Sequence, residues 1–291
     1  MDVTAIKNAL ADTSQLPALQ ASQVTLMTNL IDFFQENQLT YFVTGGTVLG
    51  AKYYQGFIPY DDDIDMAMPR QDFERFLNMV RNQKFELKNL DQTYRVQHFS
   101  MDDQFKYTIA RVENLNYHVI DIMDLHNQAA HPAIDIAPID GTPNSRWVRK
   151  LFFNKLYVLR GLLTIAYSDT INPIRRQTLR HRLQTIIAKT ISLFFHLNPT
   201  KIKQRIEHNL SQYDMADSDY SGTYMGTYRD REMLPSNIWG NGSRGLFEGV
   251  SVNMPEYVND YVMQLYGGFR YYTDEELLKD RHYIIKEKLE S

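Results

Sequence analysis

Residues 60–69 have the sequence YDDDIDMAMP, in which acidic or small residues alternate with apolar ones from Asp63 onward. Successive side chains of a β-strand point to opposite faces. One face of this segment would therefore carry Asp63, Asp65 and Ala67, and the other Ile64, Met66 and Met68. The pattern predicts a strand over 63–68 with two carboxylates side by side and an apolar back.

The surrounding sequence predicts short helices and strands. Predicted helices cover 16–38, 48–54 and 70–80, and further predicted strands cover 39–43, 85–87, 94–99, 107–112, 119–123 and 133–138. Residues 147–210 read as helical, 213–249 as loop-rich and the tail from 255 as helical in pieces. We expect an α+β fold with a mixed sheet, divided into a core over 1–145, a basic helical segment over 146–210 and a C-terminal part over 211–291 that packs back on the core.

Asp135 adds a third carboxylate, on the alternating strand predicted over 133–138. Asp63 and Asp65, two positions apart on one strand face, form a pair typical of Mg²⁺ or Mn²⁺ sites, because these ions prefer carboxylate oxygens and keep positions open for phosphates. Asp135 would complete a cluster for one or two metal ions. It could also take a proton from an attacking hydroxyl.

A glycine pair, Gly45-Gly46, follows the strand predicted over 39–43 and is followed by Thr47. Such a turn leaves backbone N–H groups for an anion, and the dipole of the next helix adds to the attraction. A glycine pair after a strand is more often only a turn. Combined with the metal pair and the third acid, it favours phosphoryl or nucleotidyl transfer.

Three other interpretations of the acidic run compete with this one. A solvated loop does not explain the alternation from Asp63 onward. A calcium-binding EF-hand is excluded because Met66 stands where the sharp turn needs glycine, and Asp72 replaces the bidentate glutamate. The DxD metal site of a nucleotide-sugar glycosyltransferase stays open.

The composition excludes several classes of protein. The chain of 291 residues is 43% hydrophobic and 23% charged, which is typical of globular proteins. It contains no cysteine, so disulfides, thiolate zinc sites and cysteine nucleophiles are excluded. The first residues show no basic start followed by an apolar run, and no apolar run is long enough to span a bilayer. We therefore expect a cytoplasmic protein.

The formal net charge of −4 conceals an uneven distribution. Residues 146–207 hold 13 Lys and Arg against two acids, which leaves 18 basic and 33 acidic residues elsewhere. A segment of net +11 on a body of net −15 suggests an anionic partner for the segment. Its apolar stretches 151–153 and 193–195 suggest an anionic lipid surface at the inner membrane face. The alternative is a helical subdomain with a solvated basic face.

The motifs resemble the LicD-type phosphocholine transferases, which are related to fukutin and fukutin-related protein. The resemblance rests on GGTVLGA (45–51), GFIPYDDDID (56–65), MPR (68–70), IDIAPIDG (134–141), LFEG (246–249), MP (254–255) and LYG (265–267). It spans residues 29–268, and the basic helical middle is its least diagnostic part.

The resemblance implies a polymerase-β-like nucleotidyltransferase core and an activity. Members of this family transfer a phosphorylated alcohol, often phosphocholine from CDP-choline, to a sugar hydroxyl of a cell-surface glycan. By position, Asp63 and Asp65 would be metal ligands, Asp135 the third ligand or base, and the 45–47 turn (Gly45, Gly46, Thr47) the binding site for the donor phosphates. The resemblance does not distinguish phosphocholine from phosphoethanolamine, phosphoglycerol or ribitol phosphate.

Further candidates are less specific. Lys52 and Arg111 could neutralise phosphate, or be solvated surface charges, and Glu248 lies in the C-terminal matching block. A quaternary ammonium favours an aromatic cage, for which Tyr224, Tyr228 and Trp239 are available, although core packing is the commoner role of such rings.

Two functional hypotheses follow. The first is a metal-dependent phosphotransferase that takes a CDP-activated alcohol as donor and a glycan, or its lipid-linked precursor, as acceptor. The second is a non-catalytic protein of the same fold whose basic segment holds an anionic polymer. No interleaved aromatic and basic motif of an RNA-binding module occurs, so we expect no nucleic-acid partner.

Overall fold

A mixed β-sheet lies at the centre of the computed structural model, which describes residues 3–88, 93–122, 130–167, 190, 197–226 and 228–288. The strands follow the order β1 (Phe42–Val43), β2 (Ile64–Pro69), β6 (Ala133–Gly141), β4 (Ala110–Asn114) and β3 (Tyr94–Gln97), and β7 (Tyr220–Gly222) with β8 (Leu234–Pro235) continues from the end of β6. Strands β2 and β6 are parallel, and the other pairs are antiparallel. The predicted α+β class with a mixed sheet is confirmed.

Helices α2 (Leu16–Glu36) and α4 (Arg70–Arg81) pack against this sheet and against each other. Helix α4 begins directly after Pro69 and has Asp72 in its first turn and Arg81 in its last, which suits the helix dipole. The rings of Phe34 and Phe76, 5.7 Å apart and edge to face, join the two helices in the main core. Both helices were predicted from their apolar periodicity.

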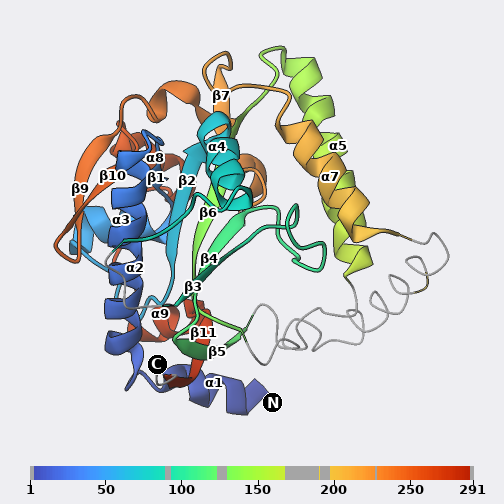
Figure 1. The fold of residues 1–291 in the computed structure, drawn as a ribbon. Helices are drawn as coiled ribbons and strands as arrows, with labels where there is room; N and C mark the ends of the chain where they lie inside the picture. Colours follow the sequence, from blue (N-terminus) through green and yellow to red (C-terminus); the bar gives the residue numbers. More distant parts are fainter. Residues whose placement is uncertain are drawn as a thin grey trace.

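Helices α5 (Arg146–Ala166) and α7 (Pro199–Leu210) run side by side at one side of the sheet (Figure 1). They share a separate apolar cluster that includes Phe152, Phe153 and Ile206. None of the described helices is long and apolar enough to cross a bilayer. The predicted apolar stretch 193–195 lies outside the described residues.

Arg70 connects this helix pair to the core. Its guanidinium makes two hydrogen bonds of 2.7 Å to the carboxylate of Asp140 on β6 and also contacts Glu207 of α7. Only 7% of Arg70 is exposed, so this network is buried. Helix α7 is therefore joined to the sheet by a buried charged contact.

The C-terminal part packs back on the core through several elements. The hairpin of β9 (Ser243–Phe247) and β10 (Val250–Met254) is followed by α8 (Val258–Tyr266), α9 (Asp274–Asp280) and β11 (Tyr283–Lys288). Strand β11 pairs with β5 (Tyr117–Asp121), and α1 (Val3–Ala11) contacts α9 and β11, so both chain ends lie in one region of the molecule (Figure 1). The tail from 255 was predicted to be helical in pieces, and strand β11 corrects that prediction over Tyr283–Lys288.

Two further local predictions need correction. The strand predicted over 85–87 is wrong: Phe85 packs 4.9 Å from the Phe33 ring, and the Leu87 N–H donates to the Tyr94 hydroxyl instead of to a neighbouring strand. The helix predicted over 48–54 begins earlier, as α3 (Gly45–Leu49), and continues as a π-helical turn (Gly50–Tyr54). Turns of this kind occur often beside functional sites.

Candidate active site

The register of the sheet places charged residues from three strands in one row. Asp65 on β2 lies beside Asp135 on β6, and Asp135 lies beside Arg111 on β4. The Arg111 Nε donates a 2.7 Å hydrogen bond to Asp135 Oδ1, and its Nη1 lies 3.3 Å from Asp121. The two carboxylates predicted on separate strands are thus neighbours, and the candidate cation Arg111 is bound to one of them.

Asp63 lies directly before β2 and contacts a histidine that the sequence did not reveal. His282 Nδ1 is 2.7 Å from Asp63 Oδ2. The charge of Asp63 raises the pKa of His282 well above its usual value. Burial opposes ionisation of Asp63, but the positive charge of His282 and its hydrogen bond prevail and lower the pKa of Asp63 to about 2. The pair is therefore ionic.

Asp62 explains how His282 reaches the site. Its buried carboxylate accepts hydrogen bonds from the backbone N–H groups of His282 (2.9 Å) and Tyr283 (3.0 Å) and contacts Arg281 Nε at 3.4 Å. Only 1% of Arg281 is exposed, and it also donates to the Asp12 carbonyl oxygen. Neighbouring aspartates thus differ in role, because Asp62 fixes the C-terminal segment while Asp63 faces the cavity.

The 45–47 turn lies directly against Asp65. Gly45 has a φ of +57°, and a Cβ atom there would lie 2.6 Å from Asp65 Oδ2, so both backbone conformation and space require glycine. The Gly45 N–H donates to the Tyr261 hydroxyl (3.0 Å), and the Asp65 N–H donates to Thr47 Oγ1 (2.9 Å). A Cβ on Gly46 would lie 3.3 Å from Asp61. The turn positions Asp65, and its role in binding donor phosphates stays a prediction.

A cavity of about 490 Å³ opens at this row of charges. Its acidic lining residues are Asp63, Asp65, Asp135, Asp140 and Glu232, and its other lining residues include Thr44, Gly45, Tyr107, Arg111, Arg160, Tyr224, Tyr228, Tyr261 and His282. The structure therefore brings together, around one space, the three predicted carboxylates, Gly45 and Arg111.

Gly46 and Thr47 are outside the cavity lining but belong to the 45–47 turn, whereas three further candidates lie away from both. Lys52 is outside this lining, with its Nζ 5.6 Å from the centre of the Tyr53 ring. Glu248 is in the turn between β9 and β10, where its Oε1 accepts a hydrogen bond from the Phe57 N–H. The Trp239 ring packs in the core against Phe42, whereas the other two rings of the predicted cage line the cavity.

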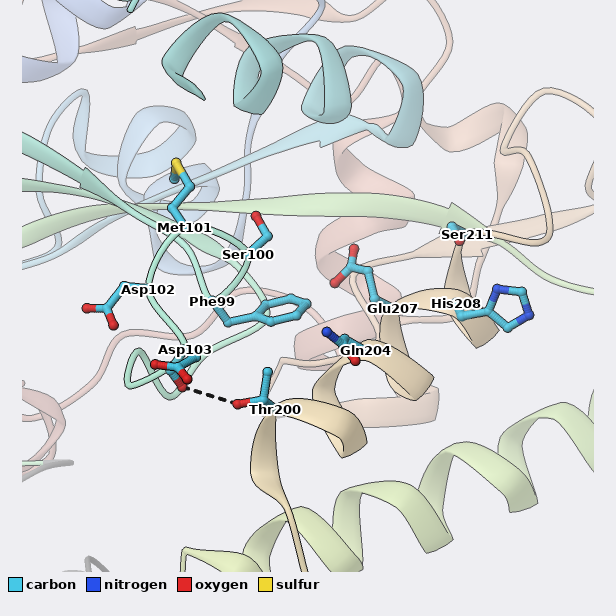
Figure 2. Close-up of a pocket in the computed structure, with 10 residues that line it drawn as sticks. All are labelled: Phe99, Ser100, Met101, Asp102, Asp103, Thr200, Gln204, Glu207, His208 and Ser211. Carbon is cyan, nitrogen blue, oxygen red and sulfur yellow. Dashed lines mark hydrogen bonds between the residues drawn. The ribbon is translucent and has the colours of Figure 1, made fainter. Parts of the chain in front are cut away.

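A larger hollow of about 680 Å³ lies between the 99–103 loop and α7, which Figure 2 shows facing each other. The loop contributes Asp102 and Asp103, and the helix contributes Glu207 and His208. Thr200 Oγ1 lies 3.5 Å from the Asp103 carbonyl oxygen across the hollow. None of the predicted site residues lines it, so chemistry places the candidate active site in the smaller cavity.

The electrostatics of the row suit a divalent cation. Burial, and then the charges of Asp63 and Asp135, raise the pKa of Asp65 well above its usual value. Asp65 is a hard oxygen donor, and its carboxylate accepts no hydrogen bond from any described residue. Mg²⁺ or Mn²⁺ prefers such ligands, so the donor chemistry fits.

The residues fit a metal site in the type of their donor atoms and in their positions on neighbouring strands. Asp63 and Asp135 are paired with His282 and Arg111, and within the described ranges no three acidic or histidine side chains converge on one point that could hold a metal ion. Binding of a cation would therefore require the carboxylates to converge. Each carboxylate has two oxygens, so the contacts of Asp63 with His282 and of Asp135 with Arg111 can persist beside a metal ion.

Sequence comparisons find related proteins for the part of the chain that holds this site. Residues 38–154 match the sequence profile of the LicD/FKTN/FKRP nucleotidyltransferase domain, which contains all three carboxylates and the 45–47 turn. The chain is 22% identical over 260 residues to the lipopolysaccharide cholinephosphotransferase LicD of Haemophilus influenzae, covering 87% of this chain and 92% of that protein.

Two shorter matches are to uncharacterized proteins. One from Rickettsia typhi is 31% identical over 67 residues, which cover 22% of each chain. One from Rickettsia prowazekii is 38% identical over 47 residues, which cover 16% of this chain and 18% of that one.

Proposed function

We propose that the protein transfers phosphocholine from CDP-choline to a sugar hydroxyl of a cell-surface glycan, because residues 38–154 match the LicD/FKTN/FKRP nucleotidyltransferase domain. The near full-length similarity to a lipopolysaccharide cholinephosphotransferase supports this choice of alcohol and acceptor. The register that sets Asp65 beside Asp135, at a cavity that Asp63 also lines, is the structural observation that carries the proposal.

The reaction forms one bond and breaks one. The sugar hydroxyl oxygen attacks the phosphorus that carries choline, the bond from that phosphorus to the bridging oxygen breaks, and CMP leaves. The hydroxyl proton passes to a carboxylate, for which Asp135 is placed at the cavity. Phosphoryl transfer depends mostly on positioning and charge neutralisation.

Mg²⁺ or Mn²⁺ would be held by Asp63, Asp65 and Asp135. When bound, the ion would neutralise charge on the donor phosphates. Arg111 positions Asp135 through its 2.7 Å hydrogen bond, and His282 positions Asp63. Gly45 allows the Asp65 carboxylate to lie against the turn.

A ligand panel tests the donor. Melting temperatures are measured with CDP-choline, CDP-ethanolamine, CDP-glycerol and CDP-ribitol, each with Mg²⁺, Mn²⁺ or EDTA. A ligand at about 100 times its Kd stabilises by about 2.7 kcal/mol, which a melting curve resolves. We expect the largest shift with CDP-choline and a divalent ion. A larger shift with a neutral alcohol donor, or no shift with any donor, would contradict the proposal.

The acceptor side involves helix α5, which we propose lies on an anionic membrane and brings the protein to a lipid-linked acceptor. Trp147, Leu151 and Val158 are 78%, 67% and 63% exposed and lie on one face of this helix. Arg146, Lys150 and Lys155 are exposed beside them. An exposed apolar stripe flanked by basic residues fits the interface of a bilayer that contains anionic lipid.

A further inference from the structure

Glu232 is a buried carboxylate in the wall of the active-site cavity, on the side that residues 223–226 and 228 also line. It is 6% exposed. Its Oε1 accepts a 3.1 Å hydrogen bond from the Tyr228 N–H, and its Oε2 accepts one from the Thr223 hydroxyl. A Cβ on Gly226 would lie 2.3 Å from Oε1, so the loop closes tightly around this group. The carboxylate is therefore built into the wall and is not a mobile surface charge.

The charge of Glu232 has no ionic partner among the described residues. Arg160 is the described cation whose charge acts on it, and that guanidinium donates hydrogen bonds to the carbonyl oxygens of Tyr224 and Gly226. Burial raises the pKa of Glu232 to about 7. A buried carboxylate without an ion pair is costly, and a cationic ligand in the cavity would offset that cost.

Aromatic side chains surround the same part of the cavity. Tyr224, Tyr228 and Tyr261 line it. Burial raises the pKa of Tyr224 and of Tyr261, and the charge of Glu232 adds to both increases. The Tyr224 hydroxyl is buried and has no hydrogen-bond partner within the described part of the chain. Aromatic side chains beside a carboxylate form an environment that suits a large cation without N–H groups.

We propose that Glu232 and these tyrosines form the subsite for the quaternary ammonium of the donor, so that Glu232 determines the preference for a cationic alcohol. The inference rests on the proposed function. A trimethylammonium group cannot donate hydrogen bonds, and the bonds from Thr223 and Tyr228 already satisfy the carboxylate. Asp63, Asp65 and Asp135, with a bound divalent cation, would receive the phosphate end of the same molecule.

The experiment compares ligands of equal shape and different charge. Dissociation constants are measured by calorimetry for CDP-choline and for its neutral isostere, in which a tert-butyl group replaces trimethylammonium. We expect the wild-type protein to prefer CDP-choline by about tenfold or more, as for a close pair of desolvated charges. A preference below about twofold, with CDP-choline still bound, would overturn the inference.

Glu232→Gln is the central variant. The glutamine side chain can accept from the Tyr228 N–H and donate to Thr223 Oγ1, so it removes the charge and keeps both hydrogen bonds. We expect it to abolish the preference and to leave the affinity for CDP unchanged. Glu36→Gln removes the same charge from an exposed site on α2 and should keep the preference.

Two results would separate the possible failures. The inference is overturned if Glu232→Gln retains the wild-type preference for CDP-choline. It is also overturned if the affinities for CDP and CDP-choline fall equally, because Glu232 then does not recognise the quaternary ammonium. If the wild-type protein binds CDP but not CDP-choline, the proposed function fails, whatever Glu232 does. Should the Gln variant not fold, Glu232→Asp keeps a negative charge and should keep a preference, and its loss would overturn the inference.

Discussion

The carboxylate of Asp65 lies between two neighbours of the same charge, Asp63 and Asp135. Its pKa is raised by burial first and by these charges second. Because the folded-state pKa lies above the unfolded value of 3.8, ionised Asp65 destabilises the fold, and this effect grows as the pH rises above that value. The site therefore loses stability through a concentration of negative charge that suits a cation, and the cation would in turn neutralise donor phosphates.

Replacing Asp65 by Asn should stabilise the metal-free protein. We expect the melting temperature of Asp65→Asn in EDTA to exceed that of the wild type at pH 7, because like-charge repulsion is removed. Mg²⁺ should raise the melting temperature of the wild type and not of the variant. Asp32→Asn, at an exposed position on α2, is the control. Equal stabilisation of both proteins by Mg²⁺ would count against Asp65 as a ligand.

His98 makes stability depend on pH at a distance from the active site. It is 2% exposed, packs 5.7 Å from the Phe73 ring, and its Nε2 has no partner among the described groups. Burial lowers its pKa from 6.5 to about 3. The folded state thus holds neutral histidine while the unfolded state takes a proton below about pH 6.5, so stability is lost as the pH falls through that value.

The stability that is lost because His98 stays neutral should be measurable between pH 7 and pH 5.5. From pH 7 to pH 5.5, the free energy of unfolding measured with urea should fall more in the wild type than in His98→Phe. We expect the difference to be about 1 kcal/mol. His208→Gln, an exposed histidine on α7, should behave like the wild type. An identical pH dependence in wild type and His98→Phe would show that His98 is not held neutral.

At the scale of elements, helix α5 shows how one sequence pattern serves two surfaces. Phe152 and Phe153 are buried against α7 and Tyr224, whereas Leu151 is exposed. The sequence suggested that the whole apolar stretch 151–153 contacts an anionic lipid surface. In the structure only Leu151 of this stretch is exposed. The exposed stripe consists of Trp147, Leu151 and Val158, which sequence alone could not separate from the packing face.

The double variant Trp147→Ser, Leu151→Ser should lose membrane binding. In co-sedimentation with vesicles that contain phosphatidylglycerol, at about 0.15 M salt, the wild type should be found in the pellet with the vesicles. The variant should stay in the supernatant. Tyr271→Ser removes a comparably exposed apolar side chain, at 81%, and should bind like the wild type. If the wild type itself stays in the supernatant, α5 does not contact anionic lipid.

At the scale of the whole molecule, local patterns predicted local structure. The period of the 63–68 run predicted β2, the period of 133–138 predicted β6, and apolar spacing predicted α2 and α4. The parallel pairing that sets Asp65 beside Asp135 depends on sheet topology, which a periodicity does not contain. The sequence was therefore sufficient to identify the carboxylates. It was not sufficient to predict that Asp65 and Asp135 lie side by side.

The residues that the sequence missed act over long separations along the chain. His282 reaches Asp63 because Asp62 binds the backbone at 282 and 283 and because β11 pairs with β5. Glu232 lines the cavity through a loop that the sequence indicated only as irregular. No local signal distinguishes such residues from surface charges.

Release of CMP from CDP-choline tests the central claim most directly. The rate is measured for wild type and Asp65→Asn with Mg²⁺ and choline-free lipopolysaccharide, after melting curves confirm that both proteins are folded. We predict that the wild type releases CMP with transfer of phosphocholine to the glycan, and that Asp65→Asn is slower by about a hundredfold or more. A variant rate within about tenfold of the wild type, or a wild type that releases no CMP, would contradict the account.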